Sequence, residues 1–350
     1  MSNIVWEKFK KTVLGDRMIQ PHDRVLIAVS GGPDSVCLLH LFCRLKKIMD
    51  IDISAAYINH KLRPEDEIKK EIGKIKSTTS LHGVPLYVKN LKPPAKKSNL
   101  EKWARDARYK ALLSIALSGG YEKIAMGHNQ NDQAETVLLS IIRSTGEDGI
   151  PGIPASRVLT APRTAHAPRT PHSRKKITLV RPLINITRKE ITGYLREKDL
   201  PYSSDSTNLD TAITRNFLRL KVMPLLESRN PSITQHLSNL AVWSESINGY
   251  FENLTRRALS SILISSGKQA GKNYVALDLL KFLRYNKCLR YRLMKSILMM
   301  TPAITNYSKA AGVLLGKIEK ASGGRIPRRL FVRTGNVSAT IRGGKLYLKL

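Results

Sequence analysis

The first candidate site is a turn of six residues, Ser30, Gly31, Gly32, Pro33, Asp34 and Ser35. It follows a β-branched apolar run and precedes leucines at helical spacing, so it joins a buried strand to a helix. Two glycines let the backbone turn tightly and aim its N–H groups outward, and the helix start adds free donors. Such a turn suits a phosphate. Asp34 would repel that phosphate unless a cation lies between them, which predicts a Mg²⁺ ligand.

A second polar cluster, Gly127-His-Asn-Gln-Asn-Asp-Gln-Ala-Glu-Thr136, leaves another apolar run and enters a helix. Asp132 and Glu135 are three residues apart and therefore share a helical face. Carboxylates arranged in this way can hold a hard cation or orient an amine. An acidic first turn is also a common capping arrangement, but its pairing with the glycine turn favours a site that includes His128.

Two further clusters carry basic groups. His60 lies in the segment Asn-His-Lys-Leu-Arg that follows the second apolar run. Arg105 and Arg108 follow Glu101 by four and seven residues, which places them on one broad helical face. They suit phosphate contacts and structural salt bridges equally well.

Alternation of apolar runs with helical segments predicts an α/β fold with a doubly wound, mostly parallel sheet. In such folds ligands bind at the carboxyl ends of the strands, where all four clusters are expected. Capping-box patterns at 98–101 and 187–190 mark two of the helices. The expected strands cover residues 25–29, 53–58, 84–88 and 123–126.

We expect two domains, a catalytic one over 1–220 and a second one over 221–350. The second is predicted to be mainly helical, over 217–228, 233–263 and 277–300, with a strand-rich tail over 329–350. Within the first domain, residues 151–176 have no hydrophobic period, five prolines and no acidic residue. We interpret this segment as a mobile basic surface loop.

The net charge of the chain indicates which class of partner it binds. The chain carries 59 Lys and Arg against 27 Asp and Glu, for a net charge of +32. This excess is concentrated towards the carboxyl end, where residues 281–350 hold sixteen basic residues and one acidic residue. Such an imbalance favours a polyanion, and RNA in particular.

Three widely spaced cysteines form no metal-binding or disulfide pattern. The amino terminus lacks the apolar segment of a signal peptide, and no stretch is long enough to span a bilayer. We therefore expect a cytoplasmic protein without a membrane partner.

These motifs, in this order, resemble those of the PP-loop ATP pyrophosphatases. Three later segments, 181–183, 205–208 and 215–219, are similar to motifs of one family among them, the tRNA(Ile)-lysidine synthetases. The similarity is strongest over residues 20–225. It departs at Ser144, where that family usually has glycine, and in the long basic loop.

This resemblance implies ATP and Mg²⁺ as cofactors, and tRNA(Ile) with a CAU anticodon and free L-lysine as partners. ATP would adenylate C2 of cytidine 34, and the lysine ε-amine would then displace AMP. Asp34 and Asp132 would hold Mg²⁺, Asp132 and Glu135 would position the amine, and Arg215 would steady the nucleotide. ATP contacts are expected from residues 30–35 and from His60, Arg105, Arg108 and His128.

Three alternatives remain open. A thiolase acting on cytidine of tRNA is one, although the members with iron–sulfur clusters need grouped cysteines. A catalytically inactive RNA-binding relative is another, although such a protein would be expected to lose the glycine turn or the carboxylates. The third is an amidating ligase for a small molecule, which the positive charge disfavours. A homodimer is compatible with the sequence, which leaves the oligomeric state open.

Overall fold

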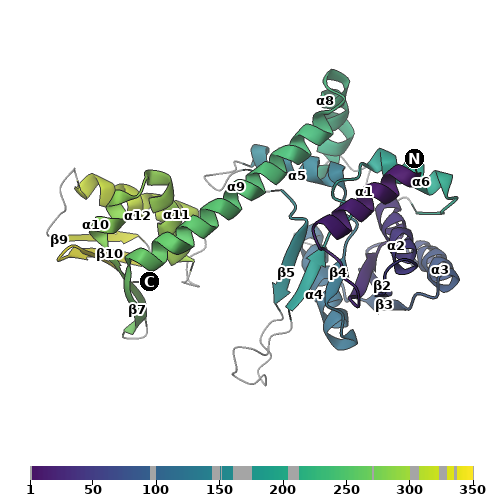
Figure 1. Ribbon diagram of the computed structural model, residues 1–350, viewed down its shortest axis with the longest axis horizontal. Coiled ribbons are helices and arrows are strands. Elements are labelled where there is room, and N and C mark those ends of the chain that lie inside the picture. Colours follow the sequence, from purple (N-terminus) through teal and green to yellow (C-terminus); the bar gives the residue numbers. More distant parts are fainter. Residues whose placement is uncertain are drawn as a thin grey trace. The chain divides into compact units, whose positions relative to one another are not determined.

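The computed structural model describes residues 2–94, 100–143, 150, 152–160, 176–203, 213–269, 272–299, 307–322, 329–334 and 337–349. The chain forms two compact units (Figure 1). Met1–Thr145 and Ile150–Trp243 make the N-terminal unit, and Ser244–Leu350 belong to the C-terminal unit. Within these ranges no helix combines the length and the apolar character needed to cross a bilayer.

A six-stranded sheet forms the centre of the N-terminal unit in the described residues, with the order β3-β2-β1-β4-β6-β5. All neighbours pair in parallel except β5 and β6, which confirms the predicted fold class. The strands are β1 (Arg24–Val29), β2 (Asp52–Asn59), β3 (Leu86–Asn90), β4 (Lys123–Ala125), β5 (Ser156–Thr160) and β6 (Lys176–Val180).

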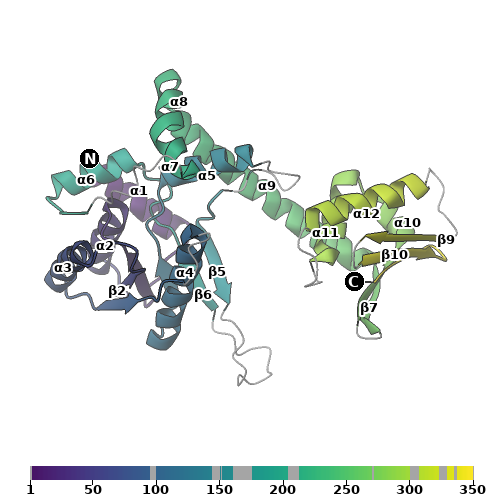
Figure 2. The ribbon, with the colours of Figure 1, turned by 180° about the vertical axis from the view of Figure 1, so that it is seen from behind.

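Helices cover both faces of this sheet (Figure 2). One apolar cluster joins α1, α2, α3 and α6 to Val25 and Ile27 of β1. A second joins α4 to Leu26, on the opposite face. Burial of β1 from both sides explains why its sequence is continuously apolar. The helices are α1 (Ser2–Gly15), α2 (Pro33–Lys46), α3 (Glu65–Leu81), α4 (Leu100–Gly119) and α6 (Arg188–Glu197).

The position of the site follows from the strand order. The chain winds from β1 outward through β2 to β3 and then returns to place β4 on the other side of β1. The carboxyl ends of β1 and β4 therefore flank the point where the winding direction reverses. Open α/β sheets bind ligands at such a point. The glycine turn follows β1 and the acidic cluster follows β4, so the topology brings the two main motifs together.

A helical layer continues the N-terminal unit beyond the sheet. It consists of α5 (Gln130–Ile142), α7 (Thr214–Phe217), a π-helical turn η3 (Leu218–Val222), α8 (Met223–Arg229) and the first part of α9 (Ile233–Ile262). We expected the division between domains near residue 220, whereas the compact unit extends to Trp243. The difference arises because Leu237 and Ala241 of α9 pack with Ala134 and Val137 of α5.

The C-terminal unit combines helices with an antiparallel sheet of order β7-β8-β11-β10-β9 in the described residues. Its strands are β7 (Leu263–Gln269), β8 (Lys272–Asp278), β9 (Arg329–Thr334), β10 (Val337–Arg342) and β11 (Lys345–Lys349). Its helices are α10 (Leu279–Arg284), α11 (Lys287–Leu298) and α12 (Tyr307–Ser322).

Two local predictions were wrong. The helix expected over 277–300 starts too early, because Leu277 belongs to β8 and pairs with Leu346 of β11, which places both side chains in the core. The loop expected over 151–176 contains β5, because residues 156–160 pair with β6. The rest of that loop, over 161–175, lies outside the described residues.

Candidate active site

The glycine turn after β1 is shaped for a phosphate. Gly31 adopts a φ of +74°, and Gly32 precedes the first turn of α2. Ser35 is buried, and its hydroxyl donates to the Gly32 carbonyl at 2.9 Å and lies 3.1 Å from the Ser30 nitrogen. No side chain caps the amino terminus of α2, whose first N–H groups and positive dipole end therefore face the turn. This arrangement fits an oxyanion.

Glycine is required in this turn for two reasons. A positive φ is strained for other residues, and a Cβ at Gly31 would lie 2.5 Å from Cγ of Glu71. After the carboxyl end of β4, a Cβ at Gly127 would lie 3.1 Å from the backbone of Asp34. Gly127 therefore lets the end of β4 approach the start of α2, which brings the two motifs into contact.

Asn129 links these two motifs. It caps α5, with its side chain accepting from the Asp132 nitrogen at 3.0 Å while Asp132 Oδ2 accepts from the Asn129 nitrogen at 3.0 Å. Its side-chain amide donates to Asp34 Oδ1 at 2.8 Å. One side chain thus orients both carboxylates that the sequence suggested as Mg²⁺ ligands. The interpretation of Asp132 as a helix-capping residue is confirmed, and the same side chain also lies at the candidate site.

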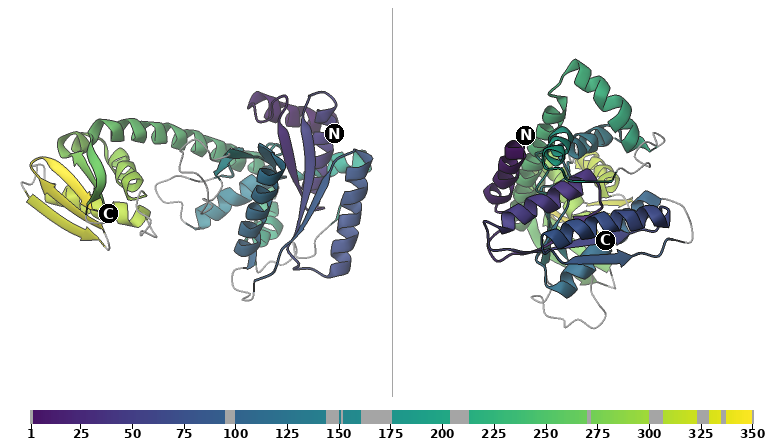
Figure 3. Two further views of the ribbon diagram at one scale, coloured as in Figure 1. Left: turned by 90° about the horizontal axis from the view of Figure 1, so that it is seen from below. Right: turned by 90° about the vertical axis from the view of Figure 1, so that its right-hand side faces the viewer.

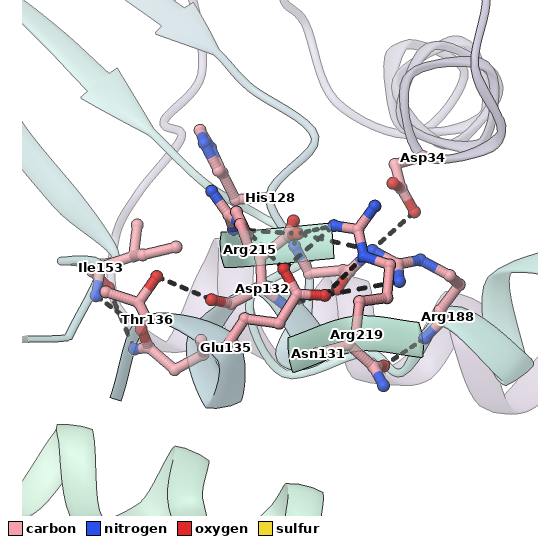
Figure 4. A network of polar contacts seen from close by, with 12 residues as sticks. Asp34, His128, Asn131, Asp132, Glu135, Thr136, Ile153, Arg188, Arg215 and Arg219 are labelled. Carbon is pink, nitrogen blue, oxygen red and sulfur yellow. Dashed lines mark hydrogen bonds and ion pairs between the residues drawn. The ribbon is translucent and has the colours of Figure 1, made fainter. Parts of the chain in front are cut away.

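Three guanidinium groups surround Asp132 and Glu135 (Figure 4). Glu135 accepts from Arg215 Nε at 2.8 Å, from Arg219 Nε at 2.7 Å and from Arg219 Nη2 at 3.0 Å. Asp132 Oδ1 lies 3.2 Å from Arg215, 3.4 Å from Arg219 and 3.5 Å from Arg188. The Glu135 side chain is only 1% exposed. We call these five residues the arginine–carboxylate cluster.

Charge is not balanced within this cluster. Three guanidinium groups and two carboxylates leave one positive charge beside the glycine turn. Burial, together with the facing Asp132, raises the pKa of Asp34 to about 6, against the lowering effect of Arg188, Asn129 and Arg219. The two aspartates therefore repel each other in the absence of a cation. A bound cation between them would relieve that repulsion.

Elements far apart in the sequence supply the arginines. Arg188 opens α6, and its backbone nitrogen donates to Asn131 at 2.9 Å. Arg215 lies in α7 and Arg219 in the π-helical turn, where the Met223 nitrogen bonds to the Leu218 carbonyl. Such wide turns often occur at functional sites. Sequence reasoning proposed Arg215 but assigned no role to Arg188, Arg219 or Asn129.

The remaining predicted residues form a second, basic group. His128 Nδ1 lies 3.3 Å from Arg181 Nε, and burial with the neighbouring arginines lowers the pKa of His128 to about 3. Burial and Arg108 lower the pKa of His60 to about 4. Within the described part of the chain, neither His60 Nδ1 nor Arg108 Nε has a hydrogen-bond partner, although both atoms are buried. The guanidinium of Arg105 lies over the ring of Tyr109. The side chain of Glu101 and residues 205–208 lie outside the described residues.

Both groups together can hold anions. In the basic group, histidines with lowered pKa values lie beside arginines for which the described residues show no carboxylate partner, and this arrangement suits a negatively charged ligand. Four histidines and arginines were predicted to contact ATP: His60, Arg105, Arg108 and His128. His128 adjoins the arginine–carboxylate cluster, because Arg215 is among the groups that lower its pKa. His60 and Arg108 interact with each other at the end of β2.

Comparison with known proteins identifies relatives. Residues 1–226 match the model of a family described as the PP-loop domain. A tRNA(Ile)-lysidine synthase from Clostridioides difficile strain 630 is 30% identical over 87% of this chain and 62% of its own length. Another, from Nostoc sp. strain PCC 7120, is 31% identical over 71% of this chain and 67% of its own length. This chain spans about half of several further curated relatives.

Among solved structures, the U34-tRNA thiolase NcsA from Methanococcus maripaludis aligns with a TM-score of 0.55. It covers 71% of this chain and 79% of its own, at 16% sequence identity. This likeness concerns the fold alone.

Proposed function

Because this chain belongs to the PP-loop family and, within it, to the tRNA(Ile)-lysidine synthases, we propose that it ligates free L-lysine to C2 of cytidine 34 in tRNA(Ile). The reaction has two steps. ATP adenylates the C2 oxygen with release of pyrophosphate, and the lysine ε-amine then displaces AMP. The observation that carries this proposal is the meeting of a glycine turn, two aspartates and three arginines at the switch point of the sheet.

The first step requires a held pyrophosphate and an exposed α-phosphate. We assign the holding role to the turn at Ser30–Ser35 and to the amino terminus of α2. Arg188, Arg215 and Arg219 would stabilise the charge that develops on the phosphate oxygens. Their own orientation is set by Asp132 and Glu135, which hold them before any ligand binds.

Asp34 and Asp132 fit a Mg²⁺ ion. Both are carboxylates, Asn129 orients both, and their mutual repulsion calls for a cation. No group of three metal-ligating side chains occurs among the described residues. Two carboxylates with substrate phosphates are a usual Mg²⁺ environment. When bound, the ion would neutralise phosphate charge and stabilise the leaving pyrophosphate.

The second step requires a deprotonated lysine amine. An unperturbed ε-amine has a pKa of about 10.4, so a carboxylate near it would help to position it and to accept a proton. We propose Asp132 for this contact, because its side chain remains 12% exposed. Glu135 is almost fully buried, and among the described residues its ion pairs are all with guanidinium groups, so we propose that it positions Arg215 and Arg219.

One incubation tests the function. The protein is mixed with ATP, Mg²⁺, labelled lysine and either isoleucine or methionine tRNA, both with a CAU anticodon. We expect label in the isoleucine tRNA only, and none after Asp34→Asn. Lys8→Gln serves as a matched control, because Lys8 pairs with Glu190 outside the site. Incorporation of sulfur and not of lysine, when a sulfide source is added to the same mixture, would support the thiolase alternative and contradict the proposal.

A further inference from the structure

In the described residues, one face of the C-terminal sheet carries half-buried and exposed side chains along β9, β10 and β11. Helices α10, α11 and α12 pack on the other face, through an apolar core that includes Ala339, Ile341, Leu346 and Leu348 (Figure 3). Residues alternate along β10 and β11 between buried and exposed positions. The residues between the core positions therefore form an outward surface. We call it the outer sheet face: Phe331, Arg333, Ser338, Thr340, Arg342, Lys345, Tyr347 and Lys349.

Two aromatic rings lie on this face. Phe331 is 67% exposed and Tyr347 is 39% exposed. The register pairs Thr340 of β10 with Phe331 on one side and with Tyr347 on the other. Adjacent strands are about 4.8 Å apart, so the two aromatic residues lie about 10 Å apart with a small residue between them. Exposed aromatic rings bordered by basic residues are suited to contact a ligand that has both flat rings and negative charge.

The charged groups on the outer sheet face are all basic, although Asp278 of β8 lies beside them on the same side of the sheet. Arg333, Arg342, Lys345 and Lys349 surround the aromatic pair, and none of the eight residues is acidic. The nearest carboxylate in the register is Asp278, opposite Lys345, and it is engaged in capping α10 at 3.0 Å from the Lys281 nitrogen. A second copy of this basic chain would be repelled here.

We propose that the outer sheet face binds unpaired RNA nucleotides, with bases stacked on Phe331 and Tyr347 and phosphates contacting the four basic residues. Open sheets with aromatic residues bind single-stranded RNA in this manner, because every base has a π-face. This inference rests on the proposed function, because that function makes tRNA the expected RNA ligand. It adds a location and a type of recognition, since a duplex hides its bases from such a surface.

Fluorescence anisotropy of the full chain with two probes tests this surface. The probes are a labelled twelve-nucleotide pyrimidine RNA and a labelled tRNA(Ile) transcript. We expect Phe331→Ala and Tyr347→Ala each to raise the Kd for the single strand about fivefold or more, which is the lower end of base stacking. Phe331→Trp retains an aromatic ring and should bind within about twofold of the parent. Leu280→Ala is the matched control, because Leu280 is 53% exposed on α10.

Lys349→Gln should reduce the salt dependence of binding. Unlabelled single strand should compete with the probe more strongly than a blunt duplex. Unchanged binding by both alanine variants, or equal competition by the duplex, would overturn the proposal. Because this binding assay contains neither ATP nor lysine, a failure of the ligase reaction would not change the binding result. Conversely, a chain that forms lysidine but binds RNA normally after both alanine substitutions refutes only the stacking surface.

Discussion

Replacing Glu135 by glutamine separates an anchoring role from direct contact with lysine. The substitution keeps the shape of the side chain, removes its charge and turns an amide donor towards a guanidinium. It affects contacts of 2.7 to 3.0 Å to Arg215 and Arg219. The charge of the arginine–carboxylate cluster rises from +1 to +2, because one of the two carboxylates opposing three arginines is lost.

The expected loss of stability follows from burial. Removing one partner of a buried ion pair costs about 3–5 kcal/mol. The two arginine side chains are 28% and 24% exposed and keep Asp132 as a partner, so water and Asp132 recover part of this loss. We expect about 2–3 kcal/mol, which for a unit of this size lowers Tm by about 4–12 °C. A misplacement of Arg215 by about 1 Å should slow the adenylation step about 100-fold.

Thermal melting, pyrophosphate release and lysine incorporation are measured on the same preparation. Glu190→Gln is the control, since Glu190 lies in the capping box of α6 and pairs with Lys8 at 2.6 Å, with no contact to Asp132 or Glu135 among the described interactions. It should lower Tm without slowing either step. A Glu135→Gln variant that melts like the parent, releases pyrophosphate normally and loses only lysine incorporation would refute the anchoring argument.

Three further outcomes are expected. Gly31→Ala should abolish ATP binding and destabilise the fold by about 2 kcal/mol or more, because the new Cβ meets Glu71 at a φ of +74°. The control Gly73→Ala has open space around the new Cβ and should be neutral or stabilising. Equal effects of the two variants on thermal melting and on ATP titration would contradict this reasoning. Burial lowers the pKa of His40 from 6.5 to about 4, so the folded state binds fewer protons than the unfolded state and stability should fall as pH decreases from about 6.5 to about 4. His40→Gln should flatten the dependence of Tm on pH over this window. Affinity for tRNA should weaken steeply with salt if phosphate contacts dominate, and a flat log–log plot of Kd against salt would count against them.

Much of the N-terminal unit could be predicted from the sequence, because its signals are local. A continuous apolar strand, two glycines and a capping pattern identified β1, the turn and the start of α6 without knowledge of the fold. Asp34 and Asp132 were paired because strand ends in such folds converge. Arg188 and Arg219 were not assigned, because their contacts with Glu135 and Asp132 depend on long-range packing.

The C-terminal unit was harder to predict for a related reason. The segment 263–278 carries few β-branched residues. Its two strands pair with each other, β8 also pairs with β11, and both lie in the sheet that shares the apolar core. β11 lies tens of residues beyond β8, and only the complete sheet favours the extended conformation over a helix. Alternation within residues 337–349 was strong enough to predict the tail.

The distance in sequence between Glu135 and its arginines also bears on biosynthesis. Arg215 and Arg219 follow Glu135 by 80 and 84 residues. During translation the glycine turn and α5 therefore emerge from the ribosome well before the cations that neutralise Glu135. A buried carboxylate without those cations is costly, so we expect α5 to reach its final packing only after η3 has been synthesised. A nascent chain thus completes the arginine–carboxylate cluster only after residue 219 has been synthesised, when most of the N-terminal unit is available.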